Sequence, residues 1–148
     1  MQIEKATPAD IPALSELLSA LFSQEAEFTP NSEAQAKGLN QIIGNPEVGA
    51  VLVAREGGQV VGMVNLLFTV STALGGQVAL LEDMVVSSQA RGAGVGSELL
   101  DQAISFARAQ GCKRITLLTD RENESAQRFY GKKGFVVSGM VPMRRDIK

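Results

Sequence analysis

Apolar residues follow a helical spacing near the N-terminus and a strand-like spacing in the middle of the chain. After a short strand predicted over residues 2–6, Thr7 and Pro8 are typical of a helix start, and leucine and isoleucine then recur at helical intervals. A second, weaker helical pattern covers residues 32–43 and stops at the sequence Gly-Asn-Pro. These patterns predict two helices ahead of the first long strand.

The spacing changes at residue 49, where two β-rich runs are joined by the turn sequence EGGQ at residues 56–59. The sequence TALGGQ then turns the chain into a third run, VALLEDMVVS. Three consecutive runs joined by short turns predict an antiparallel meander.

A glycine-rich stretch follows the meander and leads into an apolar helical stripe that ends near Gly111. The chain then shows a buried strand over residues 113–120, a short helix capped by Asn123, and one or two strands over residues 135–148. This order of elements predicts one α/β (α+β) domain over residues 1–148, in which helices pack on a mixed sheet.

The composition limits the chemistry that the chain can perform. Its 148 residues are 45% apolar and 20% charged, with a net charge of −2, one cysteine and no histidine. This inventory argues against nucleic acid as a partner and against a zinc or transition-metal cluster, so no metal is expected. No apolar run is long enough to span a membrane and no signal-peptide pattern opens the sequence, so we expect a cytoplasmic protein without a membrane partner.

The sequence RGAGVGS at residues 91–97 lies between a predicted strand and a predicted helix. Unpaired N–H groups at a helix start and glycines that permit close approach favour a bound phosphate, and Arg91 adds positive charge. A nucleotide P-loop is excluded because Gly96 is followed by Ser97 and Glu98 instead of lysine. The dinucleotide fingerprint is disfavoured because serine stands where its third glycine is required. A plain turn remains the alternative.

Two separate motifs resemble those of the GCN5-related N-acetyltransferase (GNAT) superfamily. The sequence RGAGVG fits the Gln/Arg-x-x-Gly-x-Gly/Ala signature with which that family holds the pyrophosphate of acetyl-CoA. The later sequence NESAQRFY, followed by Gly134 and Phe135, is similar to the family's Asn-x-x-Ala-x-x-Phe-Tyr block and its Gly-Phe ending. The resemblance covers essentially the whole chain, and the stretch LEDMVVSSQARGAGVGSELL resembles the diamine and polyamine acetyltransferases most.

The resemblance implies a GNAT-type central sheet, mixed and mostly antiparallel, of six to seven strands flanked by about four helices, with a V-shaped splay between the fourth and fifth strands. It also implies acetyl-CoA as co-substrate. The cofactor-binding residues expected on this basis are Met84, Val85, Val86, Arg91, Gly92, Ala93, Gly94, Val95, Gly96, Ser97, Asn123 and Ala126. Ordinary core packing explains the side chains of residues 84–86 equally well, and helix capping explains Asn123.

By the same resemblance Tyr130, the only tyrosine, is the expected general acid that returns a proton to the departing thiolate; a partly buried aromatic ring is the alternative. Glu82 and Asp83 are adjacent in an otherwise apolar strand, where neighbours point to opposite faces. Because Glu82 shares its row with apolar side chains, we expect it to act as a base through water or to bind the substrate ammonium, with a structural salt bridge as the alternative. Asp83 is the second substrate-binding candidate.

The sequence therefore predicts an N-acetyltransferase that acetylates a primary amine of a small molecule, such as a polyamine or an amino acid, by direct attack on acetyl-CoA. The alternatives are a protein or peptide acceptor, and an acyl-CoA-binding regulatory module without turnover. Phe22, Phe28 and Phe68 are candidates to line an acceptor pocket, with core packing as their alternative, and the acidic run at residues 25–27 is a candidate to attract a cationic acceptor. Dimers are common in the family, so a homodimer is a further expectation.

Overall fold

The computed structural model describes residues 1–25 and 29–147. Its chain divides into two compact units, Met1–Leu118 and Thr119–Lys148. The single domain expected over residues 1–148 remains a prediction, and each unit is described by itself below. Phe28, and residues 26 and 27 of the acidic run, lie outside the described residues.

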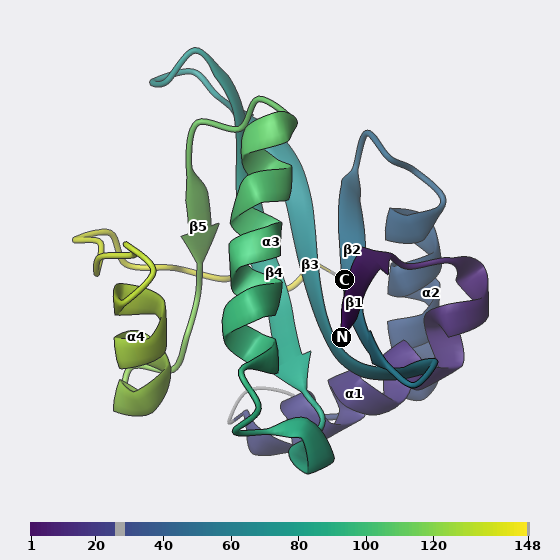
Figure 1. Cartoon of the computed structure of the whole chain (residues 1–148). Helices are drawn as coiled ribbons and strands as arrows, with labels where there is room; N and C mark the ends of the chain where they lie inside the picture. The colour runs from purple at the N-terminus through teal and green to yellow at the C-terminus, as the bar shows by residue number, and fades with distance from the viewer. Residues whose placement is uncertain (26–28, 148) are drawn as a thin grey trace. The chain divides into compact units, whose positions relative to one another are not determined.

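A mixed sheet forms the centre of the first unit (Figure 1). Its strands, in spatial as well as chain order, are β1 (Gln2–Lys5), β2 (Gly49–Glu56), β3 (Gln59–Ser71), β4 (Gly76–Val86) and β5 (Ile115–Leu117). The first four pair antiparallel, and β5 pairs parallel with β4. The predicted meander is confirmed as β2–β3–β4.

The tight hairpin between β2 and β3 is confirmed as well. Glu56 pairs with Gln59, and the two residues between them, Gly57 and Gly58, have φ angles of 56° and 82°. Two consecutive residues in the left-handed region are what the twist of a two-residue hairpin requires, and glycine adopts that region without a steric cost.

Helices cover both faces of this sheet (Figure 1). Their bounds are α1 (Ile11–Gln24), α2 (Ser32–Ile43) and α3 (Val95–Ala109), and a 3-10 turn, η1 (Pro8–Asp10), precedes α1. The helices α1 and α2 lie on one face and α3 on the other. The second helix begins and ends where its apolar spacing predicted, and Asn31 caps it by accepting a hydrogen bond from the Ala34 amide at 3.1 Å.

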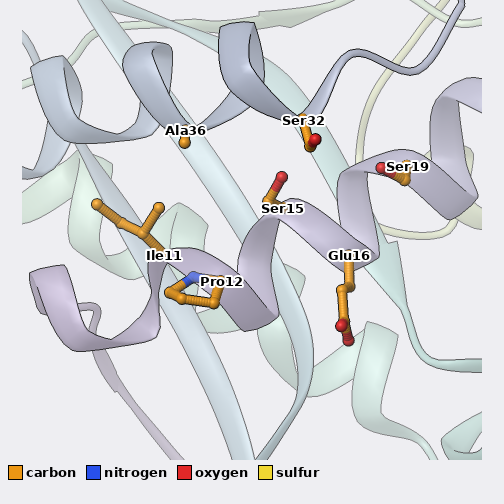
Figure 2. Close-up of a pocket in the computed structure, with 7 residues that line it drawn as sticks. All are labelled: Ile11, Pro12, Ser15, Glu16, Ser19, Ser32 and Ala36. Carbon is orange, nitrogen blue, oxygen red and sulfur yellow. The ribbon is translucent and has the colours of Figure 1, made fainter.

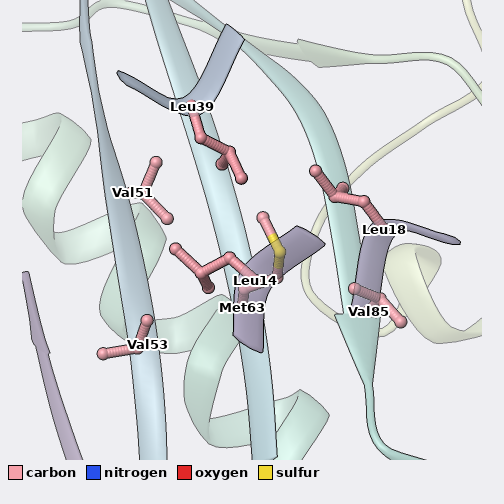
Figure 3. Packing of buried hydrophobic residues seen from close by; sticks show 7 residues of the cluster. All are labelled: Leu14, Leu18, Leu39, Val51, Val53, Met63 and Val85. Carbon is pink, nitrogen blue, oxygen red and sulfur yellow. The ribbon is translucent and has the colours of Figure 1, made fainter. Parts of the chain in front are cut away.

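The core between α1, α2 and the sheet consists of interlocking aliphatic side chains (Figure 3). Leu14 and Met63, which are both 0% exposed, meet there between α1 and β3. The remaining buried members are Leu18, Leu39, Val51, Val53 and Val85. Alternate residues of β2, β3 and β4 therefore point toward α1 and α2, whereas Gly62 on the opposite face lies against Leu99 and Val95 of α3.

Two expectations for the C-terminal part are corrected by the structure. The strand β5 is only half-buried, because it lies at the edge of the described sheet with β4 as its neighbour. In residues 135–147 the second unit shows no strand, so the described sheet has five strands instead of six to seven. Gly139 and Pro142 interrupt this apolar run, and proline lacks the N–H that a strand pairing needs. The regular element of this unit is α4 (Glu124–Gly131).

No helix in the described part of the chain is both long and apolar enough to cross a membrane.

Candidate functional site

The glycine loop takes the chain from the end of β4 to the start of α3 through a short 3-10 turn, η2 (Ser88–Ala90). Gly92 and Gly94 have φ angles of 87° and 80°, a left-handed conformation that strains any other residue type. A Cβ built on either glycine would meet no atom of the described residues within 4 Å. Backbone conformation, and not crowding by the described residues, therefore requires glycine at these two positions.

The start of α3 has the properties of an anion site. Gly94 is its N-cap and offers no side chain to the amides of the first turn, which lack helical partners. The following residues Gly96 and Ser97 are half-buried, while Arg91 is exposed at the entry to the loop. Free amides, the helix dipole and a nearby guanidinium together favour a negatively charged group such as a phosphate.

Over its last residues, β4 has no strand partner on the β5 side within residues 1–25 and 29–147, and this stretch is called the open edge of β4 below. Pairing between β4 and β5 covers Ala79–Leu81 on one strand and Ile115–Leu117 on the other, while β4 continues to Val86. The Ser87 amide donates to the Val61 carbonyl at 2.7 Å, so in the alternating antiparallel pattern the amide of Val85 also points toward β3. The backbone groups of Met84 and Val86 consequently point away from β3, toward the open edge.

A β-bulge precedes this open edge. Asn65 of β3 pairs with Asp83, but the next residue, Leu66, pairs with Leu81, so Glu82 is the extra residue on β4. The bulge breaks the strict alternation of side chains along β4, from which Glu82 was predicted to lie in a buried apolar row. That prediction is wrong, because Glu82 is exposed. Asp83 is the half-buried member of the pair.

Asp83 is held by the side chain of Asn65. The Asn65 amide nitrogen Nδ2 donates to Asp83 Oδ2 at 2.9 Å, and the Asp83 backbone N–H donates to Asn65 Oδ1 at 2.7 Å. Burial raises the pKa of Asp83 to about 6, the Asn65 hydrogen bond lowers it in part, and the neighbouring charge of Glu82 raises it. Asp83 thus changes charge close to neutral pH.

The remaining predicted site residues belong to α4 in the second unit. Asn123 caps this helix, since its Oδ1 accepts from the Ala126 amide at 3.0 Å, which confirms the capping interpretation. The ring of Tyr130 is half-buried between Phe129 and Phe135, with ring centres 5.2 and 5.8 Å away. Burial raises the pKa of Tyr130, so its hydroxyl keeps its proton at neutral pH.

Residues 11–135 match the model of the Acetyltransferase (GNAT) family. The chain belongs to this family.

Relatives of the chain agree with that assignment. An uncharacterized N-acetyltransferase, YhfO of Bacillus subtilis, is 30% identical over 137 residues that cover 91% of this chain and 89% of that protein. The aminoalkylphosphonate N-acetyltransferase of Salmonella typhimurium is 28% identical and covers 90% of this chain and 84% of its own length. Among solved structures, an integron cassette protein from the metagenome of Cole Harbour salt marsh superposes with a TM-score of 0.85 at 26% identity, over 99% of this chain and 91% of its own.

This GNAT protein is therefore an N-acetyltransferase, and the family implies acetyl-CoA as its co-substrate. The residues present fit that molecule: the left-handed glycines and the bare start of α3 suit its phosphates, and the open edge of β4 suits an extended chain with amide groups. In residues 1–25 and 29–147 no cluster of His, Cys, Asp or Glu is arranged to hold a metal ion.

A hollow of about 420 Å³ adjoins the glycine loop in this GNAT fold. One wall is the side of α1 that carries Glu16 and Gln24, and the other contains Val86 and Arg91. A second groove of about 300 Å³ lies between α1 and α2, where Ser15 and Ser32 face each other and the carboxylate of Glu16 points away from α2 (Figure 2).

Phe22 and Phe68, the two described phenylalanines expected in an acceptor pocket, lie on opposite faces of the sheet. Phe68 stacks on Phe106 of α3, with ring centres 6.5 Å apart, whereas Phe22 packs against the core on the α1 side of the sheet. The core interpretation is confirmed for Phe22, whereas Phe68 is half-buried in its contact with α3.

Sequence reasoning missed Asn65. The available signal was one amide inside the apolar run VVGMVNLLFTV, which a buried strand tolerates only when the amide is hydrogen-bonded.

Proposed function

We propose that this GNAT protein transfers the acetyl group of acetyl-CoA to a primary amine of a small molecule, such as a polyamine or an amino acid. The observation that carries the proposal is the glycine loop, which opens α3 directly after the free edge of β4. The name of the Salmonella relative, an aminoalkylphosphonate N-acetyltransferase, supports an acceptor of small size.

In this proposal the backbone of β4 and the loop hold acetyl-CoA. The backbone groups of Met84 and Val86 bind the acetyl and pantetheine arm, and Val85 contributes packing from the neighbouring position. The glycine loop, residues 91–97, binds the pyrophosphate. Asn123 and Ala126 contact the cofactor from the start of α4.

The chemistry is direct attack. The lone pair of the amine forms a C–N bond with the thioester carbonyl carbon, the C–S bond breaks, and the thiolate takes a proton from the hydroxyl of Tyr130. Burial raises the pKa of Tyr130, so the hydroxyl enters the reaction protonated. Among the residues on the first unit, Glu82 accepts the amine proton through water or binds the ammonium, and Asp83 adds a second negative charge to the acceptor site.

A turnover screen of acetyl-CoA against polyamines, amino acids, aminoglycosides and peptides tests the proposal. We expect thiol release with at least one small amine. Calorimetry that shows CoA binding while every amine fails would contradict it and favour an acyl-CoA-binding module; turnover of peptides alone would favour a protein acceptor.

Two variants test the assigned parts. Gly94→Val should weaken CoA binding by at least ~100-fold, because it distorts the loop, whereas Gly58→Val is the matched control: Gly58 has nearly the same φ, 82° against 80°, but lies in the β2–β3 hairpin. Tyr130→Phe should lower kcat by about 100-fold and leave CoA affinity nearly unchanged. Normal turnover in that variant removes the acid role.

A further inference from the structure

Asn65 has a polar side chain in the interior of the first unit. It is 2% exposed, and both ends of its amide bond to a single residue, Asp83: Oδ1 to the backbone N–H and Nδ2 to the carboxylate. A buried amide that lost these partners would cost stability without a compensating contact. The pair is therefore a specific two-point clamp.

This clamp lies at the bulge. The ladder between β3 and β4 shifts by one residue between Asn65 and Leu66, and the clamp supplies a side-chain acceptor for the Asp83 amide at that shift. An apolar residue of similar size at position 65 would fill the same volume and provide neither bond. The clamp therefore joins β3 to β4 directly after the bulge, two residues beyond Leu81, the last residue of β4 that pairs with β5.

The clamp lies on the face of the sheet that α1 and α2 cover. Asn65 is two residues from Met63, and Asp83 is two residues from Val85, and both of these apolar residues belong to the core beneath α1 and α2. Since alternate strand residues share a face, the Asp83 carboxylate lies on the α1 and α2 side, opposite to α3.

We propose that Asn65 is a positioning residue for acetyl transfer, which locks the β4 bulge and holds the Asp83 carboxylate where it binds the ammonium group of the acceptor. The inference rests on the proposed function, because it needs an amine acceptor. Asn65 itself touches neither substrate.

Glu82 is the charged neighbour that raises the pKa of Asp83, which gives the clamp a measurable effect. Glu82 lies beside Asp83 on β4. On the same face of the sheet, Glu16 is the charged residue of α1, and α2 carries Glu33 and Lys37; the strands β3 and β5 contain no charged residue in their sequences. On the opposite face α3 carries Glu98, Asp101 and Arg108. The Asn65 amide is thus the group that favours the ionised form of Asp83 against burial and against Glu82.

The test compares Asn65→Asp with the wild-type protein. The substitution preserves the shape of the side chain but replaces the Nδ2 donor with a second carboxyl group beside Asp83, so the pair should lose its last proton at a pH at least about one unit above that at which wild-type Asp83 ionises. We expect the acidic limb of kcat/KM for the acceptor to move to higher pH by the same amount, KM for the acceptor to rise about tenfold at neutral pH, and CoA affinity to stay within about twofold. An unchanged limb and an unchanged KM would overturn the inference.

A double variant, Asn65→Asp with Asp83→Asn, separates positioning from stability. It restores an amide opposite a carboxylate, with the two groups exchanged between β3 and β4, so the fold should recover. If Asn65 only stabilises the bulge, acceptor KM recovers with it; if the carboxylate must stand on β4, KM stays raised. Recovery of both the fold and the wild-type acceptor KM would contradict the positioning role.

A titration of the Asp83 carboxyl by carbon NMR keeps this inference distinguishable from the proposed function. If the wild-type protein acetylates no amine, the proposed function fails, and the titration still reports whether Asn65 controls the charge of Asp83. If Asn65→Asp leaves that titration in place while the wild-type protein turns over amines, the positioning inference alone fails. Asp10→Asn, which breaks an ion pair at the start of α1, is the control for lost stability, and its acidic limb should not move.

Discussion

Asp10 and Asp83 are two aspartates of the first unit that are largely shielded from solvent, and their hydrogen-bond partners differ in charge. Asp10, 8% exposed before α1, accepts two hydrogen bonds from the Arg55 guanidinium at 2.9 and 2.8 Å. Asp83 has a neutral amide as its side-chain partner and a second carboxylate as its neighbour. The Arg55 hydrogen bond lowers the pKa of Asp10 despite its burial, while burial raises that of Asp83 to about 6.

The difference shows that the carboxylate of Asp10 stabilises the folded protein, whereas the ionised carboxylate of Asp83 destabilises it. A charge paired with a guanidinium stabilises the native state, and Asp10 also accepts the Thr7 amide at 2.9 Å, which fixes the entry into α1. A charge that burial disfavours is maintained at the expense of stability, which is common where a protein binds its ligand. The same substitution, Asp to Asn, should therefore have opposite effects at the two positions.

The largest effect is expected for Asp10→Asn. It leaves Arg55 without its bidentate partner and should lower the free energy of unfolding by about 3 kcal/mol at neutral pH. The folded pKa of Asp10 lies below its unfolded value of 3.8, so this contribution is present above pH 3.8 and is lost as pH falls through the folded pKa. Urea unfolding at neutral and acidic pH measures both. A loss of similar size at low pH would contradict the ion-pair explanation.

Asp83→Asn should instead stabilise the protein, by about 2 kcal/mol at about pH 8. The folded pKa of Asp83 is raised, so its cost is absent below 3.8, grows as pH rises, and is complete above about 6. The amide introduced at position 83 would still accept a hydrogen bond from Asn65 Nδ2, while acceptor KM should rise. Urea unfolding over this pH range shows whether the substitution raises or lowers the free energy of unfolding. A variant that is less stable than the wild-type protein at alkaline pH would contradict the expected contrast with Asp10→Asn.

A smaller effect is expected for Arg55→Lys. Lysine keeps the positive charge near Asp10 but cannot form the two parallel hydrogen bonds, so the free energy of unfolding should fall by about 1 kcal/mol. The variant separates the effect of the positive charge from the effect of the two parallel hydrogen bonds in the contribution that the Asp10–Arg55 pair makes to the free energy of unfolding. A loss as large as that of Asp10→Asn would show that geometry accounts for all of it.

The smallest effect on stability is expected for Glu82→Gln, since Glu82 is exposed: less than about 0.5 kcal/mol in urea unfolding. Removing its charge should lower the pKa of Asp83, so the acidic limb of acceptor kcat/KM should move to lower pH, opposite to Asn65→Asp. If neither acceptor KM nor the limb changes, Glu82 has no part in acceptor binding.

Elements with a strong local signal could be predicted from the sequence. The Gly57-Gly58 hairpin and the bounds of α2 follow from turn residues, caps and spacing, and the glycine loop follows from its φ requirements. The bulge could not be predicted, because it depends on a contact between Asn65 and Asp83, which are 18 residues apart. The bulge overturns the predicted burial of Glu82, since a one-residue slip changes the alternation of the strand.

The C-terminal run was predicted wrongly for a related reason. Its apolar composition favours strands, but strand formation needs a paired neighbour, and residues 135–147 show no pairing in the structure described. The roles of Tyr130, Asn123 and the loop residues stay predictions from motif resemblance.

The open edge of β4 has a consequence for amide exchange with solvent. The N–H of Val85 is held in the ladder with β3, whereas those of Met84 and Val86 point toward the edge that β5 leaves at Leu81. Neighbouring amides of one strand should therefore exchange at alternating rates in heavy water, slow at 85 and fast at 84 and 86. An extended ligand bound at this edge would slow the exchange of the Met84 and Val86 amides to a rate similar to that of Val85. Amide exchange would therefore report, for each residue, whether the edge is occupied.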